Sequence, residues 1–250
     1  MIDQAGSPPT TPRPESIDRR PPTNPGPRAA APGRGVGRLG WTALSAMLVA
    51  LGMIFFYAPT ERVQGDVQRI FYLHLGLAWV GFLAFFVVFV ASIGYLWKRT
   101  SGWDVWARSS AEVGVVYMTL VLITGSIWAK PVWGTWWTWD ARLTTTLILW
   151  LIYLAYLVVR AYASEPGRAA RYAAVIGIIG FLDVPIVYQS VNWWRTLHPG
   201  PTVVQSGGGS GLTPAMMATL LVTLVAFTVL YLYLTRLKAG IERAKDALLA

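Results

Sequence analysis

The chain has 250 residues, of which 54% are hydrophobic and 13% are charged, and its mean hydropathy is +0.47. A soluble protein carries about twice that share of charged residues, near 25%. There is no cysteine, which excludes disulfides, thiolate metal sites and a Cys-x-x-Cys-His haem attachment within this chain. The composition therefore predicts a membrane protein that uses no thiol chemistry.

Six apolar stretches follow one another along the chain, and each reaches or approaches the ~17–25 residues that a helix needs to cross the hydrocarbon core. They are residues 41–58, 70–97, 111–129, 143–159, 172–190 and 214–235. None of them alternates polar with apolar residues as a transmembrane β-strand does. The sequence predicts an all-α, polytopic membrane protein with six transmembrane helices.

The flanks of these stretches differ from the membrane domain, which we expect over residues 39–238. Residues 1–38 hold nine of the sixteen prolines and little that could form a core, which predicts a disordered cytoplasmic tail. Residues 239–250 are expected to form a cytoplasmic C-terminal tail. Within the fifth stretch, Asp183 and Pro185 interrupt the apolar run, and the proline should kink the helix because it lacks a backbone donor.

The net charge of +9 is unevenly distributed along the chain. If the N-terminus is cytoplasmic, only five of the 21 Lys and Arg residues lie on the outer side, and the other 16 lie in the tails and in the loops 98–110 and 160–171. This asymmetry follows the positive-inside rule and predicts that both termini are cytoplasmic. The outer segments are then 59–69, 130–142 and 191–213. Topology thus accounts for the basic charge, and we expect no nucleic-acid partner.

Four tryptophans crowd into seven residues of the outer segment 130–142: Trp133, Trp136, Trp137 and Trp139. The aromatic belt of a membrane protein spreads its rings over many helix ends, so it explains this concentration poorly. Indole rings stack on flat apolar surfaces, and the cluster therefore favours a platform for a flat amphiphilic ligand such as a porphyrin. Trp193 and Trp194 form either a second wall of that site or part of the belt, and both interpretations stay open.

His74 and His198 are the only histidines of the chain, and the predicted topology places both near the outer surface. A single interfacial histidine is more often satisfied by a carbonyl or a lipid headgroup. Two histidines on the same side of the membrane as the tryptophan cluster, however, favour metal ligation. A zinc site needs three or four protein ligands, whereas haem needs only two axial ligands because the porphyrin supplies the other four.

Charged residues beside the cluster have two interpretations. Asp140 precedes the fourth apolar stretch, where it either caps the helix or contacts the ligand. Arg142 lies on the outer side against the charge rule, and a guanidinium can bind a haem propionate with two parallel hydrogen bonds. Arg69 is a weaker candidate for that contact, as are Arg62 and Arg195.

Three motifs in order resemble a known family. Residues 133–144 resemble the tryptophan-rich "WWD" signature of haem-handling proteins in cytochrome c maturation. The segments 69–74 and 192–198, which end at the two histidines, resemble the flanking segments of the haem exporter protein C family. The match covers about residues 40–236. The proline-rich tail and the Ser/Gly-rich piece after His198 depart from the family pattern without touching the motifs.

This resemblance implies a haem-transfer protein in the bacterial inner membrane with its site on the periplasmic side. Whether it also promotes covalent attachment of haem to its partner, as an enzyme would, stays open. Haem b would have His74 and His198 as axial ligands and would be presented to a membrane-anchored periplasmic haem chaperone. The expected partners include ABC-type transporter subunits and a small membrane subunit. The alternatives are a cytochrome b-like electron-transfer anchor, which usually carries histidine pairs within the membrane, and a small-solute permease, which needs a polar path across the bundle.

Overall fold

The computed structural model describes residues 35–249 apart from 164, 199, 201–202 and 204–210, so the expected tail at 1–38 lies almost entirely outside the described residues. The helices are α1 (Gly35–Gly52), α2 (Arg69–Lys98), α3 (Ser101–Trp133), α4 (Ala141–Tyr162), α5 (Pro166–Phe181), α6 (Asp183–Trp193) and α7 (Pro214–Leu249). A π-helical turn at Met53–Tyr57 extends α1, and a 3₁₀ turn at Asp66–Gln68 precedes α2.

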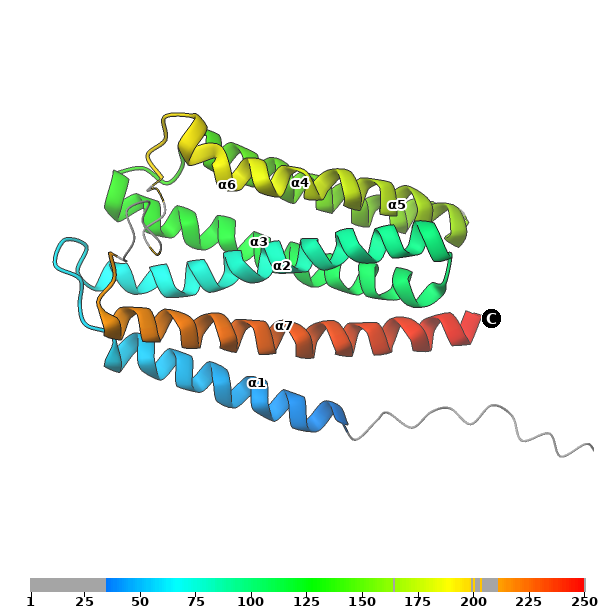
Figure 1. Ribbon diagram of the computed structural model, residues 1–250, viewed down its shortest axis with the longest axis horizontal. Coiled ribbons are helices and arrows are strands. Elements are labelled where there is room, and N and C mark those ends of the chain that lie inside the picture. The colour runs from blue at the N-terminus through cyan, green and yellow to red at the C-terminus, as the bar shows by residue number, and fades with distance from the viewer. Residues whose placement is uncertain (1–34, 164, 199, 201–202, 204–210, 250) are drawn as a thin grey trace, which may run out of the picture. The chain divides into compact units, whose positions relative to one another are not determined.

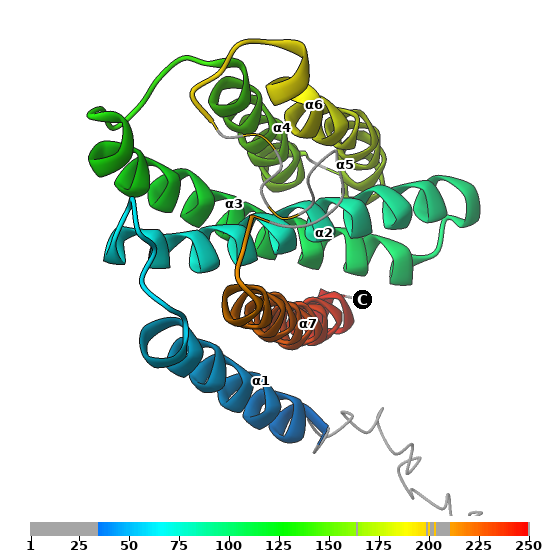
Figure 2. The ribbon, with the colours of Figure 1, turned by 60° about the vertical axis from the view of Figure 1, so that its left-hand side comes forward.

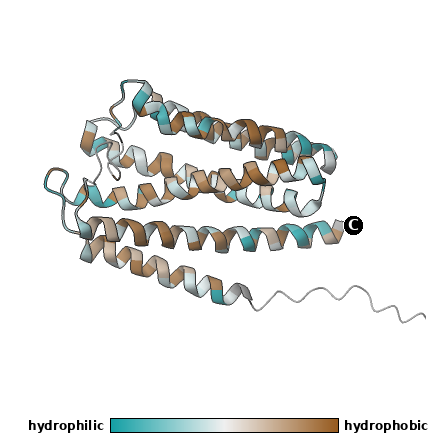
Figure 3. Cartoon of the chain, viewed as in Figure 1, coloured by the Kyte–Doolittle hydropathy of each residue, from teal (hydrophilic) through white to brown (hydrophobic). Residues whose placement is uncertain are grey.

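Six helical segments of the described chain are long and apolar enough to cross a membrane, which confirms the prediction of an all-α polytopic membrane protein. Hydrophobic residues fill the middle of the helices, and hydrophilic residues gather toward their ends (Figure 3). No β-sheet forms within the described residues. An α-helix suits the bilayer because it satisfies its own backbone hydrogen bonds where no water is available.

The helices of residues 35–249 lie side by side in a bundle (Figure 1). The pair α2 and α3 occupies the middle, with α4, α5 and α6 on one side and α7 followed by α1 on the other (Figure 2). One end of the bundle carries the connections before α2, between α3 and α4, and after α6, and we call it the tryptophan-loop end. The opposite end carries Gly35 and Leu249, and we call it the terminal end.

Small residues bring α2 and α3 close together. An added Cβ on Gly114 of α3 would lie 2.8 Å from a ring carbon of Phe85 and 2.9 Å from Cβ of Ala84, both on α2. Where α3 passes α2, a larger residue would therefore push the two helices apart. Close approach through glycine is a common device for packing helices in a membrane, where dispersion contacts replace the hydrophobic effect. This contact fixes which residues of α3 face the start of α2.

The fifth apolar stretch is broken into α5 and α6 at Leu182, as Asp183 and Pro185 predicted. The amide of Leu182 bonds to the carbonyl of Ile179 at 3.1 Å, a tightened final turn, and α6 starts at the next residue. Pro185 then lies in the first turn of α6, where amide groups have no intrahelical partner and a missing donor costs little. Asp183 sits at the same N-terminus, where the helix dipole favours a negative charge.

The last helix is longer than its apolar part. With 36 residues α7 spans about 54 Å, well beyond the ~30 Å hydrocarbon core, and it stays helical through the segment expected as a C-terminal tail. Ion pairs join this extension to α3. Glu242, whose side chain is only 5% exposed, lies 2.9 Å from Arg108 and 3.0 Å from Lys238, and Lys238 also contacts Glu112 at 2.5 Å.

Replacing Glu242 tests this connection. Glu242→Ala leaves the Arg108 and Lys238 cations partly buried without their shared carboxylate, and we expect the variant to be less stable by about 2 kcal/mol. Thermal unfolding of the purified protein in detergent measures the loss. Glu165→Ala is the control, because the Glu165–Arg168 pair is more than half exposed on both sides and should contribute little. Equal unfolding midpoints for the two variants would contradict a stabilising role of the Glu242 ion pairs.

Candidate functional site

His74 lies in the second turn of α2 and faces α3. Its Nδ1 is 3.0 Å from the hydroxyl oxygen of Thr124, and its ring meets the indole of Trp128 edge to face with centroids 5.9 Å apart. An added Cβ on Gly125 would lie 3.1 Å from Cε1 of His74, so the imidazole rests directly on the backbone of α3. One histidine is therefore held by three neighbours on a single helix.

His198 lies in the segment that follows α6. Its backbone amide donates to the hydroxyl of Thr196 at 3.0 Å, which shapes the turn that carries it. Its ring meets the indole of Trp133 edge to face, with centroids 6.3 Å apart. Trp133 is the last residue of α3, so the same helix end that carries Trp128 beside His74 carries a second indole beside His198.

The two histidines are brought together at the tryptophan-loop end. His74 contacts Trp128 and His198 contacts Trp133, and these two indoles lie five residues apart at the end of α3. Arg142 lies in the first turn of α4, which starts at the same end of the bundle. Elements that are far apart in the sequence thus bring two imidazoles and one guanidinium to the same end.

The tryptophan loop is shorter than the outer segment 130–142 expected from the sequence. Helix α3 ends at Trp133 and is capped by Gly134, whose φ of +77° is a left-handed conformation that favours glycine. Helix α4 starts at Ala141. The loop is therefore 134–140. Its indoles differ in environment: Trp136 is 57% exposed and Trp139 76% exposed, whereas Trp137 is half-buried against Trp139. The indole N–H of Trp137 is buried and has no hydrogen-bond partner within the described residues.

Asp140 caps α4, which is one of its two expected roles. Its Oδ1 accepts from the amides of Arg142 and Leu143 at 3.0 and 3.1 Å, and its Oδ2 accepts from the hydroxyl of Thr138 at 2.8 Å. Both oxygens are therefore engaged within the loop and the first turn of the helix. The cap fixes where α4 begins and hence where Arg142 projects.

Arg69 binds backbone and side-chain groups near the start of α2. Its guanidinium donates to the backbone carbonyls of Ile54 and Ala58, at the end of the π-helical turn, and its Nε lies 3.1 Å from Asp66. Five residues separate it from His74, which places it about 140° around the helix. The structure thus brings Arg69 to the junction of α1 and α2 and not beside the histidines.

Trp193 and Trp194 end α6 as an exposed edge-to-face pair with centroids 5.7 Å apart. Within the described residues, no ring contact joins them to the loop 134–140. Their exposure fits either a second wall or an interfacial belt.

Sequence reasoning missed Thr124, Gly125 and Trp128. Trp128 belongs to the same Trp-rich stretch as Trp133, and it also holds the loop before α2, since its Nε1 donates to Oε1 of Gln64 at 3.0 Å. That loop is a tight turn in which the backbone amide of Gln64 binds the Glu61 carboxylate and keeps its pKa below the ordinary value. Nothing in the sequence distinguishes Thr124 from the other hydroxyl residues of the membrane helices, because its importance depends on the register between α2 and α3.

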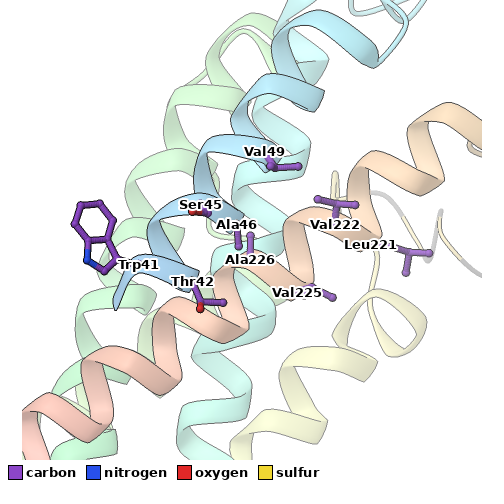
Figure 4. A pocket seen from close by; sticks show the side chains of 9 residues that line it. All are labelled: Trp41, Thr42, Ser45, Ala46, Val49, Leu221, Val222, Val225 and Ala226. Carbon is purple, nitrogen blue, oxygen red and sulfur yellow. The ribbon is translucent and has the colours of Figure 1, made fainter. Parts of the chain in front are cut away.

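A groove of about 690 Å³ lies between α1 and α7, with walls of Trp41, Val49, Leu221, Val225 and their neighbours (Figure 4). No histidine or charged residue lines it. An apolar groove between two membrane-spanning helices suits lipid chains, and it offers nothing to bind a metal.

The chain is similar in sequence to known proteins. The sequence profile of the family described as Heme exporter protein C matches residues 23–247. Heme exporter protein C of Bradyrhizobium diazoefficiens is 40% identical over 193 residues, 77% of this chain and 73% of the relative, and that of Escherichia coli K12 is 36% identical over 203 residues, 79% and 80%. A putative cytochrome c biosynthesis ccmC-like mitochondrial protein of Marchantia polymorpha is 35% identical over 164 residues, 66% and 68%. The chain belongs to the Heme exporter protein C family.

Proposed function

We propose that this protein binds haem b at the tryptophan-loop end, with His74 and His198 as the two axial ligands, and presents it to a haem chaperone during cytochrome c maturation. The observation that carries the proposal is that the only two histidines of the chain converge there, each against an indole of the end of α3. The family to which the chain belongs handles haem, which supports the same ligand.

The donor set fits haem better than a bare metal ion. Within the described residues no group of three or more His, Cys, Asp or Glu side chains could hold a metal. Haem brings four equatorial nitrogens of its own and needs only two protein ligands. When bound, the haem supplies the reactive vinyl groups and the iron, while the protein supplies ligation and orientation.

The residues around the histidines suit the rest of the macrocycle. Trp136 and Trp139 present exposed indoles for its flat apolar surface, and the half-buried Trp133 and Trp137 support them. Arg142, in the helix turn that Asp140 caps, would pair with a propionate. Trp193 and Trp194 provide a second apolar wall, whereas Arg69 is the weakest of the expected contacts because its guanidinium already holds α1 against α2.

An exposed site suits a protein that hands its ligand on. We infer that the tryptophan-loop end faces the periplasm, where a membrane-anchored chaperone reaches the haem, and that ABC-type transporter subunits and a small membrane subunit complete the complex. The charge asymmetry of the loops supports this orientation. An electron-transfer anchor is less well supported, because two histidines at one end leave no ligand pair for a second haem at the other.

Haem spectra test the ligation directly. We expect the purified protein with haem to show a low-spin bis-histidine spectrum, and His74→Ala and His198→Ala each to lose it, because each removes one axial ligand. Trp97→Phe, an exposed residue at the far end of α2, is the control and should keep the wild-type spectrum. Wild-type spectra in both histidine variants would reject the assignment.

The role of Arg142 can be tested by removing the charge from either partner. Arg142→Gln should weaken binding of haem by about 10-fold, as expected for the loss of a charge-assisted hydrogen bond. Haem dimethyl ester has no carboxylates, so the variant and the wild type should bind it equally. Arg168→Gln, an exposed arginine near the start of α5, is the control and should bind haem like the wild type. An equal loss with haem and with its ester would contradict a propionate contact and indicate a structural role for Arg142.

A further inference from the structure

We propose that Thr124 is a positioning residue that accepts the Nδ1–H of His74 and so keeps Nε2 unprotonated, as the nitrogen that ligates iron. The inference rests on the proposed haem ligation by His74. It adds a residue that touches neither iron nor porphyrin and acts only through the imidazole.

The direction of the hydrogen bond follows from the other partner of Thr124. The hydroxyl oxygen lies 2.7 Å from the carbonyl oxygen of Leu120 and 3.0 Å from Nδ1 of His74. A hydroxyl has one hydrogen, and a carbonyl oxygen can only accept, so the hydrogen goes to Leu120. The oxygen then has only lone pairs to offer His74, and the ring must be the donor.

Two other threonines of this bundle are also bonded to a carbonyl four residues back and to a ring nitrogen, and in both cases the ring can only be the hydrogen-bond donor. Thr119 donates to the carbonyl of Val115 at 2.8 Å and accepts from Nε1 of Trp150 at 2.9 Å. Thr228 donates to Leu224 at 2.7 Å and accepts from Nε1 of Trp79 at 3.0 Å. An indole N–H can only donate. A helical threonine bonded to the carbonyl four residues back therefore serves in this protein as an acceptor for a ring N–H.

The consequence for His74 concerns its tautomer. A neutral imidazole carries one ring hydrogen, so a hydrogen on Nδ1 leaves the lone pair on Nε2. No hydrogen bond to Nε2 of His74 is present within the described residues. Gly125 and Trp128 hold the ring from the same helix, at the distances given above, which limits its rotation. Metal-binding histidines commonly donate their second N–H in this way, which fixes the ring and raises its basicity.

Nitrogen NMR of the haem-free protein tests the tautomer without any bound ligand. The full chain is labelled with ¹⁵N only in histidine, which gives two imidazoles, and His198→Ala assigns the remaining one to His74. At about pH 8.5, above the ordinary histidine pKa of about 6.5, the ring is neutral. We expect Nδ1 of His74 to be protonated and Nε2 unprotonated in the wild type and in Thr124→Ser. In Thr124→Val the Nε2–H form should appear.

Thr119→Val is the matched control, because it removes the same kind of hydroxyl from the same helix without touching His74. It should leave the His74 resonances unchanged. Thr124→Val should bind haem about 10-fold more weakly than the wild type does. The midpoint potential of the haem iron should rise, because the imidazole donates less electron density to the iron. Thr124→Ser should restore both values. Correct folding of Thr124→Val is checked by its melting midpoint against that of Thr119→Val.

The outcomes separate this inference from the function on which it rests. An Nε2–H form in the wild type, or an unchanged tautomer in Thr124→Val, overturns the role of Thr124 even if both histidines ligate haem. If His74→Ala retains the wild-type haem spectrum, the proposed ligation fails, and the positioning role fails with it even though the tautomer is as expected.

Discussion

The close contact between α2 and α3 is the constraint on which the site depends. Gly114 lets the two helices approach along their length, and Gly125 continues that approach where the imidazole of His74 rests on the backbone. The register set by this contact places Thr124, Gly125 and Trp128 against His74. The same helix ends at Trp133, beside His198, so α3 is the rigid element that positions both histidines. Sites built on regular elements keep their geometry better than sites built on loops.

The two ends of the bundle have different properties. At the terminal end, buried ion pairs around Glu242 and the bidentate pair of Arg160 with Asp104, at 2.6 and 2.7 Å, hold helices together. At the tryptophan-loop end, short connections carry exposed indoles. There Asp140 caps the start of α4, and Arg69 donates to the backbone carbonyl of Ile54. An ion-paired end and an exposed end suit the proposed transfer of haem to a partner.

Much of the architecture could be predicted from the sequence, because run length, proline and capping residues act locally. The six apolar runs, the break near Pro185 and the cap at Asp140 are of this kind. The residues that surround His74 could not be predicted, since they depend on the register between helices. Arg69 shows the same limit: its sequence position suggested a propionate contact, and only the fold reveals the carbonyls of Ile54 and Ala58 beside it.

The account requires that the segments bearing the two histidines reach the same, extracytoplasmic side of the membrane. Because the chain has no native cysteine, single cysteines at exposed positions 63, 139, 195 and 168 can be labelled without background. A membrane-impermeant maleimide applied to intact cells should modify positions 63, 139 and 195, and should reach position 168 only after the inner membrane is opened. Labelling of 139 and 195 from opposite sides, or of 168 alone in intact cells, would contradict the shared outer site.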